Sequence, residues 1–225
     1  MGCLLKAGGG LHPRLAVGAV LLAAGAGSRL GHRPKALLEL GGVPLVRRAL
    51  IALSGAGVDE VVVVTGHHAM LVEPLVREFP VTLAHNPRPE DGQASSVLTG
   101  LAALSARLDA VIVALADQPL VNADDITTLV RAFKQREGAA MVVPRIDGQP
   151  GNPVIFDAAL REEWLAGGAS AACRSWRERH PERVRWLDVD NAHFRVDIDT
   201  PDDLRRFTQR TGHALRWPAA LETPA

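Results

Sequence analysis

The sequence predicts an α/β protein: a single three-layer α/β/α domain whose mostly parallel, twisted sheet is Rossmann-like. Two observations predict this fold class. Short apolar, β-branched runs alternate along the chain with amphipathic stretches of helical period. The apolar runs are nearly continuous, which is typical of parallel strands that helices cover on both faces. With 225 residues, the chain is long enough to bury a substantial core.

The expected elements follow one another from the amino-terminal side. Strands are expected at residues 17–23, 60–65, 81–84, 110–116 and 140–144. Helices are expected between them, at residues 43–56, 69–78, 95–106 and 123–136. After Gln149 the strict alternation of strands and helices ends. Short strands are expected at 153–156, 184–189 and 194–198, and helices at 158–165, 169–179 and 201–210. Strands that alternate with helices in this way are typical of βαβ units.

We expect one domain at residues 15–212, between a flexible N-terminal tail (1–14) and a C-terminal tail (213–225). The first tail is rich in glycine, and the second contains two prolines near its end. Within the domain, the regular alternation over about residues 15–145 predicts the ligand-binding half. The less regular order of strands and helices over about residues 146–212 predicts a half that covers a second substrate.

Composition limits the partners and the compartment. Lys plus Arg and Asp plus Glu number 25 each, so the net charge is zero. No overall field therefore favours nucleic acid or an anionic membrane, and we expect neither as a partner. Cys3 and Cys173 are isolated and show no metal-type spacing, and the N-terminus lacks the pattern of a signal peptide. A reduced, cytoplasmic protein is the expectation.

A glycine-rich loop follows the first expected strand. Its small residues let backbone N–H groups approach a polyphosphate closely, and Arg29, Arg33 and Lys35 add positive charge. Because the first strand of such a sheet ends at the ligand crevice, the loop is expected where ligands bind. A solvated turn would explain the glycines but not three converging cations. The loop begins with Leu22, Ala23, Ala24, Gly25, Ala26, Gly27 and Ser28.

Two familiar phosphate-binding motifs are excluded by the same residues. A Walker loop requires Gly-Lys-Ser/Thr, a tripeptide that the chain does not contain. A dinucleotide fingerprint requires a third glycine where Leu30 stands and an acid after the second strand, where this chain has Thr65-Gly66. A Rossmann-type oxidoreductase is therefore not favoured.

Asp117 directly follows the uniformly apolar run 111–116. A carboxylate at the carboxyl end of a central strand faces the ligand crevice, where it can hold Mg²⁺ against phosphate oxygens. The alternative is an aspartate that opens a turn before Pro119.

Asp197 and Asp199 form the second pair of candidate metal ligands. If residues 194–198 form a strand, period-two alternation places both carboxylates on one face. Asp199 has the alternative of bonding to the turn around Thr200, so Asp197 is the better candidate for metal. Asp202 and Asp203 are explained by the helix start, because Thr200 is a capping residue and Pro201 occupies the first helical position.

Taken together, these residues resemble the MobA-like nucleotidyltransferases and, among them, the molybdenum cofactor cytidylyltransferases. The similarity extends over about residues 16–204, and the fold that it implies is of the nucleotide-diphospho-sugar transferase type. Each motif alone is weak, whereas their order is specific for the superfamily. The motifs are Leu22-Ala23-Ala24-Gly25, Ser28-Arg29-Leu30-Gly31, Lys35, Asn86, Gly92-Gln93-Ala94-Ser95-Ser96, Ala116-Asp117-Gln118-Pro119, Gly151-Asn152-Pro153-Val154 and Asp197-Ile198-Asp199-Thr200-Pro201.

The resemblance implies roles for individual residues. The loop with Arg29 and Lys35 would bind the triphosphate, and Asp117 and Asp197, with Asp199 beside them, would position Mg²⁺ or alternatively Mn²⁺. The catalytic group would be Lys35, Arg29 and Asp117. Gly92 and Ser95 would lie near the nucleotide, with a helix N-cap as the alternative for Ser95. Ser96, Asn86, Asn152 and Arg174 would contact the acceptor, with simple turns before Pro87 and Pro153 as the alternative for the two asparagines.

The implied reaction transfers CMP from CTP to the terminal phosphate of Mo-molybdopterin and releases pyrophosphate. The guanylyltransferases of the family have a motif similar to Leu-Ala-Gly-Gly at the loop start. This chain has Ala24 in the third place of that motif, which favours CTP over GTP. One motif departs from the cytidylyltransferases: Gly167-Gly168-Ala169-Ser170-Ala171-Ala172 replaces Gly-Asp-x-Gly-Ala-Arg, so Arg174 would have to supply the missing cation.

Three alternatives stay open at this point. The acceptor could be another phosphorylated compound, such as a sugar phosphate or methylerythritol phosphate, or GMP could be the group transferred to molybdopterin. Outside the enzymes, the chain could bind a nucleotide or the cofactor only to deliver it to a molybdenum hydroxylase. The implied protein partner in either case is a molybdenum-containing dehydrogenase or its chaperone.

Overall fold

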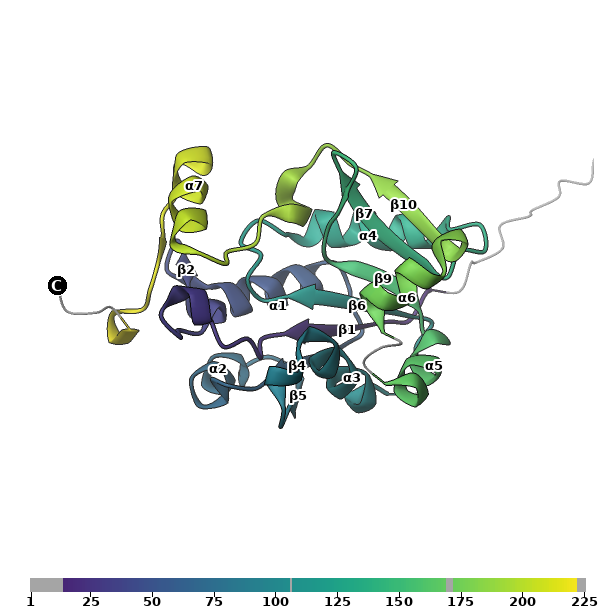
Figure 1. Ribbon diagram of the computed structural model, residues 1–225, viewed down its shortest axis with the longest axis horizontal. Coiled ribbons are helices and arrows are strands. Elements are labelled where there is room, and N and C mark those ends of the chain that lie inside the picture. Colours follow the sequence, from purple (N-terminus) through teal and green to yellow (C-terminus); the bar gives the residue numbers. More distant parts are fainter. Residues whose placement is uncertain (1–13, 106, 169–171, 222–225) are drawn as a thin grey trace, which may run out of the picture.

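The computed structural model describes residues 14–105, 107–168 and 172–221. Its central sheet has eight strands. The strand order is β10-β7-β9-β6-β1-β4-β5, and β8 pairs with β7 (Figure 1). The strands are β1 (Val17–Leu22), β4 (Glu60–Thr65), β5 (Thr82–His85), β6 (Ala110–Leu115), β7 (Met141–Ile146), β8 (Gln149–Pro150), β9 (Val154–Asp157) and β10 (Val184–Asp188).

The central strands run parallel, as predicted. β1 pairs in parallel with β4 on one side and β6 on the other, and the β4–β5 and β7–β10 pairs are also parallel. β9 is antiparallel to both of its neighbours, β6 and β7. The carboxyl ends of β1, β4 and β6 therefore meet at one edge of the sheet.

Helices cover both faces of the sheet, which confirms the three-layer α/β/α fold (Figure 1). Alternate residues of β1 point to opposite layers: Ala19 and Leu21 pack in one apolar cluster, and Val20 and Leu22 pack in the other. The first cluster lies under α1 (Leu45–Gly55), α2 (Ala69–Val76) and α4 (Ala123–Lys134). The second lies under α3 (Gln93–Ala103), α5 (Leu160–Gly167) and α6 (Cys173–Arg179).

A small satellite unit adjoins the main domain. The two-residue strands β2 (Glu39–Leu40), β3 (Val43–Pro44) and β11 (Leu215–Arg216) form an antiparallel sheet beside α7 (Pro201–Thr211). Its core is a separate apolar cluster of Leu30, Leu38, Leu45, Ile198, Phe207 and Leu215. We call it the satellite cluster.

Three expectations differ from the structure. Residues 194–198 are not a strand, because Ala192–Arg195 form a 3-10 turn, and in the segment that follows the Ile198 N–H donates to the Asp117 carbonyl. The expected C-terminal tail begins with β11 and continues into a 3-10 turn over Ala219–Leu221. The helix expected from residue 43 begins at Leu45, after β3. The expected N-terminal tail lies outside the described residues, apart from Arg14.

Within the described ranges, no helix combines the length and the apolar character that crossing a bilayer requires.

Gly100 allows α3 to pack directly on β1 and β4. A Cβ at this position would lie 2.3 Å from Val20 Cγ1 and 2.8 Å from Val64 Cγ2. Because both valines are buried and stiff, we expect Gly100→Ala to lower the free energy of unfolding by about 2 kcal/mol, measured by urea denaturation. Ala102→Ser, on the exposed side of the same helix, is the control and should change little. Equal stability of the two variants would contradict the close packing.

Candidate active site

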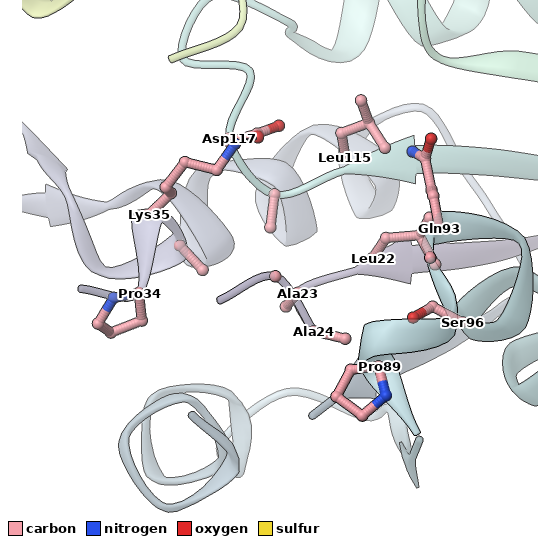
Figure 2. A pocket seen from close by; sticks show the side chains of 14 residues that line it. Leu22, Ala23, Ala24, Pro34, Lys35, Pro89, Gln93, Ser96, Leu115 and Asp117 are labelled. Atoms are coloured by element: carbon pink, nitrogen blue, oxygen red, sulfur yellow. Dashed lines mark hydrogen bonds and ion pairs between the residues drawn. The ribbon is translucent and has the colours of Figure 1, made fainter. Parts of the chain in front are cut away.

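A cavity of about 210 Å³ lies at the carboxyl ends of β1 and β6. The loop after β1, the start of α3 and the end of β6 contribute its walls, and Lys35 and Asp117 lie at one end of it (Figure 2). The predicted residues that line it are Leu22, Ala23, Ala24, Gly25, Lys35, Gly92, Ser96 and Asp117. Ala26, Gly27, Ser28, Arg29 and Ser95 lie outside this lining. Gln93 and Ala116, which belong to the quoted motifs, also line it, and the sequence prediction did not include Pro34, Ala36, Pro89 and Leu115.

The backbone of the glycine-rich loop offers hydrogen-bond donors. Among the described residues, no acceptor receives the N–H groups of residues 24–27, whereas Leu30 N–H and His32 N–H both donate to the Gly27 carbonyl. Gly27 has a φ of 61°, and a Cβ there would lie 1.9 Å from the Arg33 carbonyl oxygen, so only glycine fits. Successive free N–H groups in a tight loop form a concave site for an anion.

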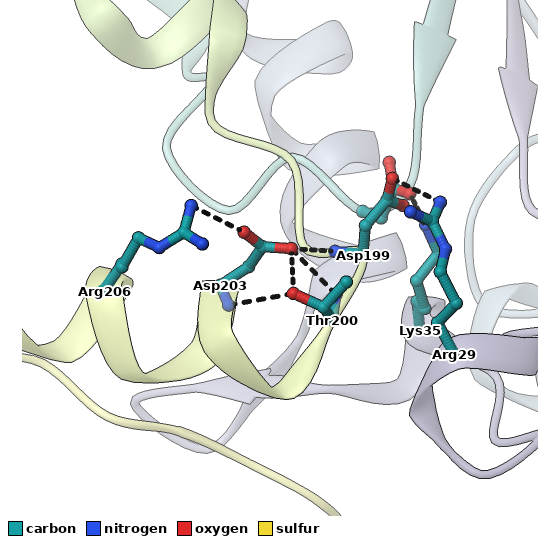
Figure 3. Close-up of polar contacts among 7 residues, drawn as sticks. Arg29, Lys35, Asp199, Thr200, Asp203 and Arg206 are labelled. Carbon is teal, nitrogen blue, oxygen red and sulfur yellow. Dashed lines mark hydrogen bonds and ion pairs between the residues drawn. The ribbon is translucent and has the colours of Figure 1, made fainter.

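Lys35 connects the loop to two carboxylates. Its ammonium donates to Asp117 Oδ2 and, at 2.6 Å, to Asp199 Oδ1. Arg29 Nη2 donates to the other oxygen, Asp199 Oδ2, at 2.7 Å (Figure 3). Burial alone would lower the pKa of Lys35, but the charges and hydrogen bonds of Asp117 and Asp199 outweigh burial and raise the pKa above its ordinary value. Lys35 is therefore a permanent cation at this edge of the sheet.

Asp199 uses both carboxylate oxygens to hold cations. Burial alone would raise the pKa of its carboxyl, but the hydrogen bond and charge of Lys35, together with those of Arg29, lower it below 3.8. Its backbone N–H donates to Asp203 Oδ2 at 3.2 Å, so the backbone, rather than the side chain, makes the bond to the turn. The Asp199 carboxylate orients Lys35 and Arg29.

Asp117 and Asp197 retain the capacity to bind a cation. Asp117 Oδ1 is buried and has no hydrogen-bond partner among the described residues. Partial loss of hydration raises the pKa of Asp197, and the charges of Asp117 and then Asp199 raise it further. A carboxylate such as Asp197, whose ionisation a neighbouring carboxylate disfavours, is suited to a bound divalent cation. No group of three or more metal-type side chains gathers in the described part of the chain. Mg²⁺ commonly binds one or two carboxylates together with substrate phosphates, so these residues fit it.

Asn86 lies behind the cavity and supports its wall. The side chain is 2% exposed, and its amide donates to Ser95 Oγ and Ser96 Oγ at 2.9 Å each. Its Oδ1 accepts from Arg88 N–H at 3.0 Å. These contacts favour the turn alternative for Asn86. The N-cap alternative for Ser95 is wrong, because α3 begins at Gln93 and Gly92 precedes it.

A second cavity, of about 340 Å³, adjoins the first and shares Gln93 with it. Two predicted acceptor residues, Asn152 and Arg174, line it, together with Arg177, which the sequence analysis did not consider. Arg174 Nε donates to Glu178 Oε1 at 2.8 Å, and most of the Arg174 side chain is exposed. Residues 169–171 of the departing motif lie outside the described residues.

A third cavity, of about 570 Å³, lies between α7 and the segment before Asp197. Its charged lining balances in sign, so it offers no clear preference for an anion or a cation. The arginines are Arg195, Arg206 and Arg210, and the aspartates are Asp190, Asp197 and Asp203.

Comparison with known proteins identifies the family. The model of the MobA-like NTP transferase domain matches residues 19–184. This chain belongs to that family. Solved relatives share the fold of this chain, which is of the nucleotide-diphospho-sugar transferase type.

Relatives with curated names differ in what they do. The chain is 32% identical to nicotine blue oxidoreductase of Paenarthrobacter nicotinovorans over 84% of this chain and 94% of that protein. It is 30% identical to a bifunctional IPC transferase and DIPP synthase of Rubrobacter xylanophilus, covering 92% of this chain and 54% of that one. The chain thus spans about half the length of the second relative.

Among solved structures, Rv0371c of Mycobacterium tuberculosis is 26% identical, with a TM-score of 0.72, and the match covers 87% of this chain and 98% of that one. A nucleotidyl transferase of Methanothermobacter is also 26% identical, with a TM-score of 0.69 and coverage of 87% and 97%. A further structure of Rv0371c, 24% identical to this chain, contains manganese.

Removal of the Lys35 charge is expected to produce a pH-dependent defect. In the wild-type chain, the lowered pKa of Asp199 stabilises the fold above pH 3.8, and the raised pKa of Lys35 stabilises it below pH 10.5. In Lys35→Met, ionised carboxylates repel one another, so their folded pKa values rise and stability is lost as pH increases. The variant should melt roughly 5 °C below wild type at about pH 7.5 and closer to wild type at about pH 4.5.

The matched control is Lys134→Met, at the exposed end of α4, which should show no such difference between the two pH values. Differential scanning calorimetry measures both variants. A Lys35→Met deficit that does not grow between the lower and the higher pH would contradict the charge arrangement.

Proposed function

We propose that this protein transfers CMP from CTP to the terminal phosphate of Mo-molybdopterin and releases pyrophosphate. The observation that carries the proposal is the contact of Lys35 with Asp117 and Asp199 beside a loop whose N–H groups have no acceptor among the described residues. Lys35 and Asp117 line the first cavity with Ala24 and Gly25 of the loop, and Asp199 joins Arg29 to Lys35. Membership of the MobA-like family supports nucleotidyl transfer.

In the proposed reaction, an oxygen of the acceptor phosphate attacks the α-phosphorus of CTP. The new P–O bond forms as the bond from the α-phosphorus to the bridging oxygen breaks, and the electron pair leaves with pyrophosphate. Because the second pKa of a phosphate monoester is about 6, the nucleophile is already ionised at neutral pH and requires no general base.

Each group around the cavity then has a defined task. The loop amides bind the triphosphate, and Lys35 and Arg29 neutralise charge that moves toward the leaving group. Asp117 and Asp197 hold Mg²⁺, or Mn²⁺ in its place, and a bound divalent ion supplies further charge neutralisation at the phosphate oxygens. The manganese in a structure of the Rv0371c protein supports a divalent ion in this family.

The second cavity is the proposed acceptor site. Its walls combine apolar residues with Asn152, Arg174 and Arg177, a mixture suited to a flat polar ring system that bears a phosphate. The proposed location is the cytoplasm, and the proposed recipient of the product is a molybdenum-containing dehydrogenase or its chaperone.

A second candidate function is oxidoreduction, which the 32% identical relative named nicotine blue oxidoreductase suggests. Leu30 occupies the place of a third fingerprint glycine, and the Thr65 hydroxyl at the end of β4 donates to Glu73. Both features depart from a dinucleotide-binding site, so transfer of a nucleotidyl group is the better-supported function. An assay for oxidation of reduced nicotinamide dinucleotide tests the second candidate in the same preparation.

The main test supplies Mg²⁺ and cell extract that contains molybdopterin, with CTP and GTP in separate reactions, and measures pyrophosphate. We expect release with CTP, and we expect Asp117→Asn and Asp197→Asn each to reduce turnover at least about a hundredfold. Asp197→Asn should also raise the metal concentration that half-maximal activity requires, because it removes a metal ligand.

Asp147→Asn is the matched control, since Asp147 is exposed in a turn and lines none of the three cavities. It should leave turnover unchanged. Activity of Asp117→Asn equal to that of Asp147→Asn would remove the basis of the proposal, as would the absence of pyrophosphate with either nucleotide.

Ala24 is the proposed determinant of the nucleotide. A Cβ added to Gly66 would lie 2.9 Å from the Ala24 Cβ and 3.0 Å from the Pro89 Cβ. The methyl group of Ala24 therefore forms part of a tightly packed wall. Ala24→Gly should widen this wall and lower the ratio of kcat/KM for CTP to that for GTP by about tenfold. Ala26→Gly, in the same loop but outside the cavity lining, is the control. An unchanged ratio in Ala24→Gly would exclude Ala24 as the determinant.

A further inference from the structure

Arg33, one of the three loop cations, is held by the C-terminal segment. Its Nε donates to the Leu30 carbonyl at 3.1 Å, and its Nη1 donates to the Leu221 carbonyl at 3.4 Å. The guanidinium carbon lies 4.4 Å from the ring centroid of Trp217, within the range of a cation–π interaction. The guanidinium therefore joins the loop to the segment that follows β11.

The loop that Arg33 fastens has an unfavourable backbone. Gly27 and Gly31 have positive φ values of 61° and 69°, and His32, which is not glycine, has a φ of 54°. A left-handed conformation in a residue other than glycine costs free energy and persists only where surrounding contacts impose it. A Cβ on Gly27 would lie 1.9 Å from the Arg33 carbonyl oxygen, so the backbone at Arg33 packs closely on this loop where it closes.

Trp217 also packs on the satellite cluster. Leu30 in that cluster follows Arg29 in sequence, and Ile198 separates Asp197 from Asp199. Both residues are almost fully buried, at 2% and 0% exposure. One C-terminal unit thus supports the loop cations on one side and the carboxylates on the other.

We infer that Trp217 is a positioning residue which, through Arg33, holds the glycine-rich loop in the conformation that exposes its N–H groups to a nucleotide. The effect on nucleotide affinity rests on the proposed function, whereas the effect on the loop does not. Arg33 is then a structural clamp, in contrast to its predicted role as a phosphate-binding cation.

Amide hydrogen exchange at Leu30 and His32, whose N–H groups donate to the Gly27 carbonyl, tests the clamp without any ligand. Trp217→Ala and Arg33→Met should each increase exchange in this loop, and Trp217→Phe, which keeps an aromatic face, should stay near wild type. Trp186→Ala is the matched control, because Trp186 lies on β10 and contacts Arg145 and Arg177. A melting curve for each variant confirms that it is folded.

Calorimetry with CTP and Mg²⁺ then measures the consequence. The dissociation constant should rise about fivefold in Trp217→Ala and Arg33→Met, and change little in Trp217→Phe and Trp186→Ala. Loop exchange in folded Trp217→Ala and Arg33→Met equal to wild type would overturn the inference. Faster loop exchange without nucleotide binding by the wild-type chain would keep the clamp and contradict the proposed function.

Discussion

The position of the Lys35 ammonium between Asp117 and Asp199 is the constraint on which the rest of the site depends. It joins the loop after β1, the end of β6 and the segment before α7, which are remote from one another in sequence. Without a cation between them, carboxylates at one partly buried edge would repel one another and lose hydration. The raised pKa of Lys35 indicates that attraction to the carboxylates exceeds the cost of burying the ammonium.

The surroundings of Lys35 explain how so flexible a side chain is held. It begins a short 3-10 helix, Lys35–Leu37, whose next two residues, Ala36 and Leu37, are buried in the main core. Leu38 then enters the satellite cluster. The backbone at Lys35 is therefore fixed by two hydrophobic units at once, and the carboxylates have only the side chain of Lys35 left to order. Packing, rather than the ion pairs alone, sets the geometry.

The sequence predicted the parts of the site that depend on long, regular elements. Asp117 was identified because a continuous apolar strand ends beside it, and the loop because small residues follow such a strand. The strand predicted at residues 194–198 was wrong, since the alternation of Val196 and Ile198 reflects burial of Ile198 in the satellite cluster and not strand pairing. The strands β2, β3 and β11 have two residues each, too few to show a period. Charge in the sequence likewise could not show that the Arg33 guanidinium lies over the ring of Trp217.

The reversed direction of β9 has a consequence for how such a protein can diversify. Since β9 runs against β6 and β7, its first residues emerge at the same edge where those strands finish. The connection from β7 to β9, which carries Gly151 and Asn152, therefore reaches the second cavity as a hairpin, without a crossover helix. Insertions or exchanges in that hairpin would reshape the second cavity while leaving β1, its loop and Lys35 untouched. If the second cavity binds the acceptor as proposed, one scaffold can acquire new acceptors by changing a surface turn, with the rest of the fold inherited intact.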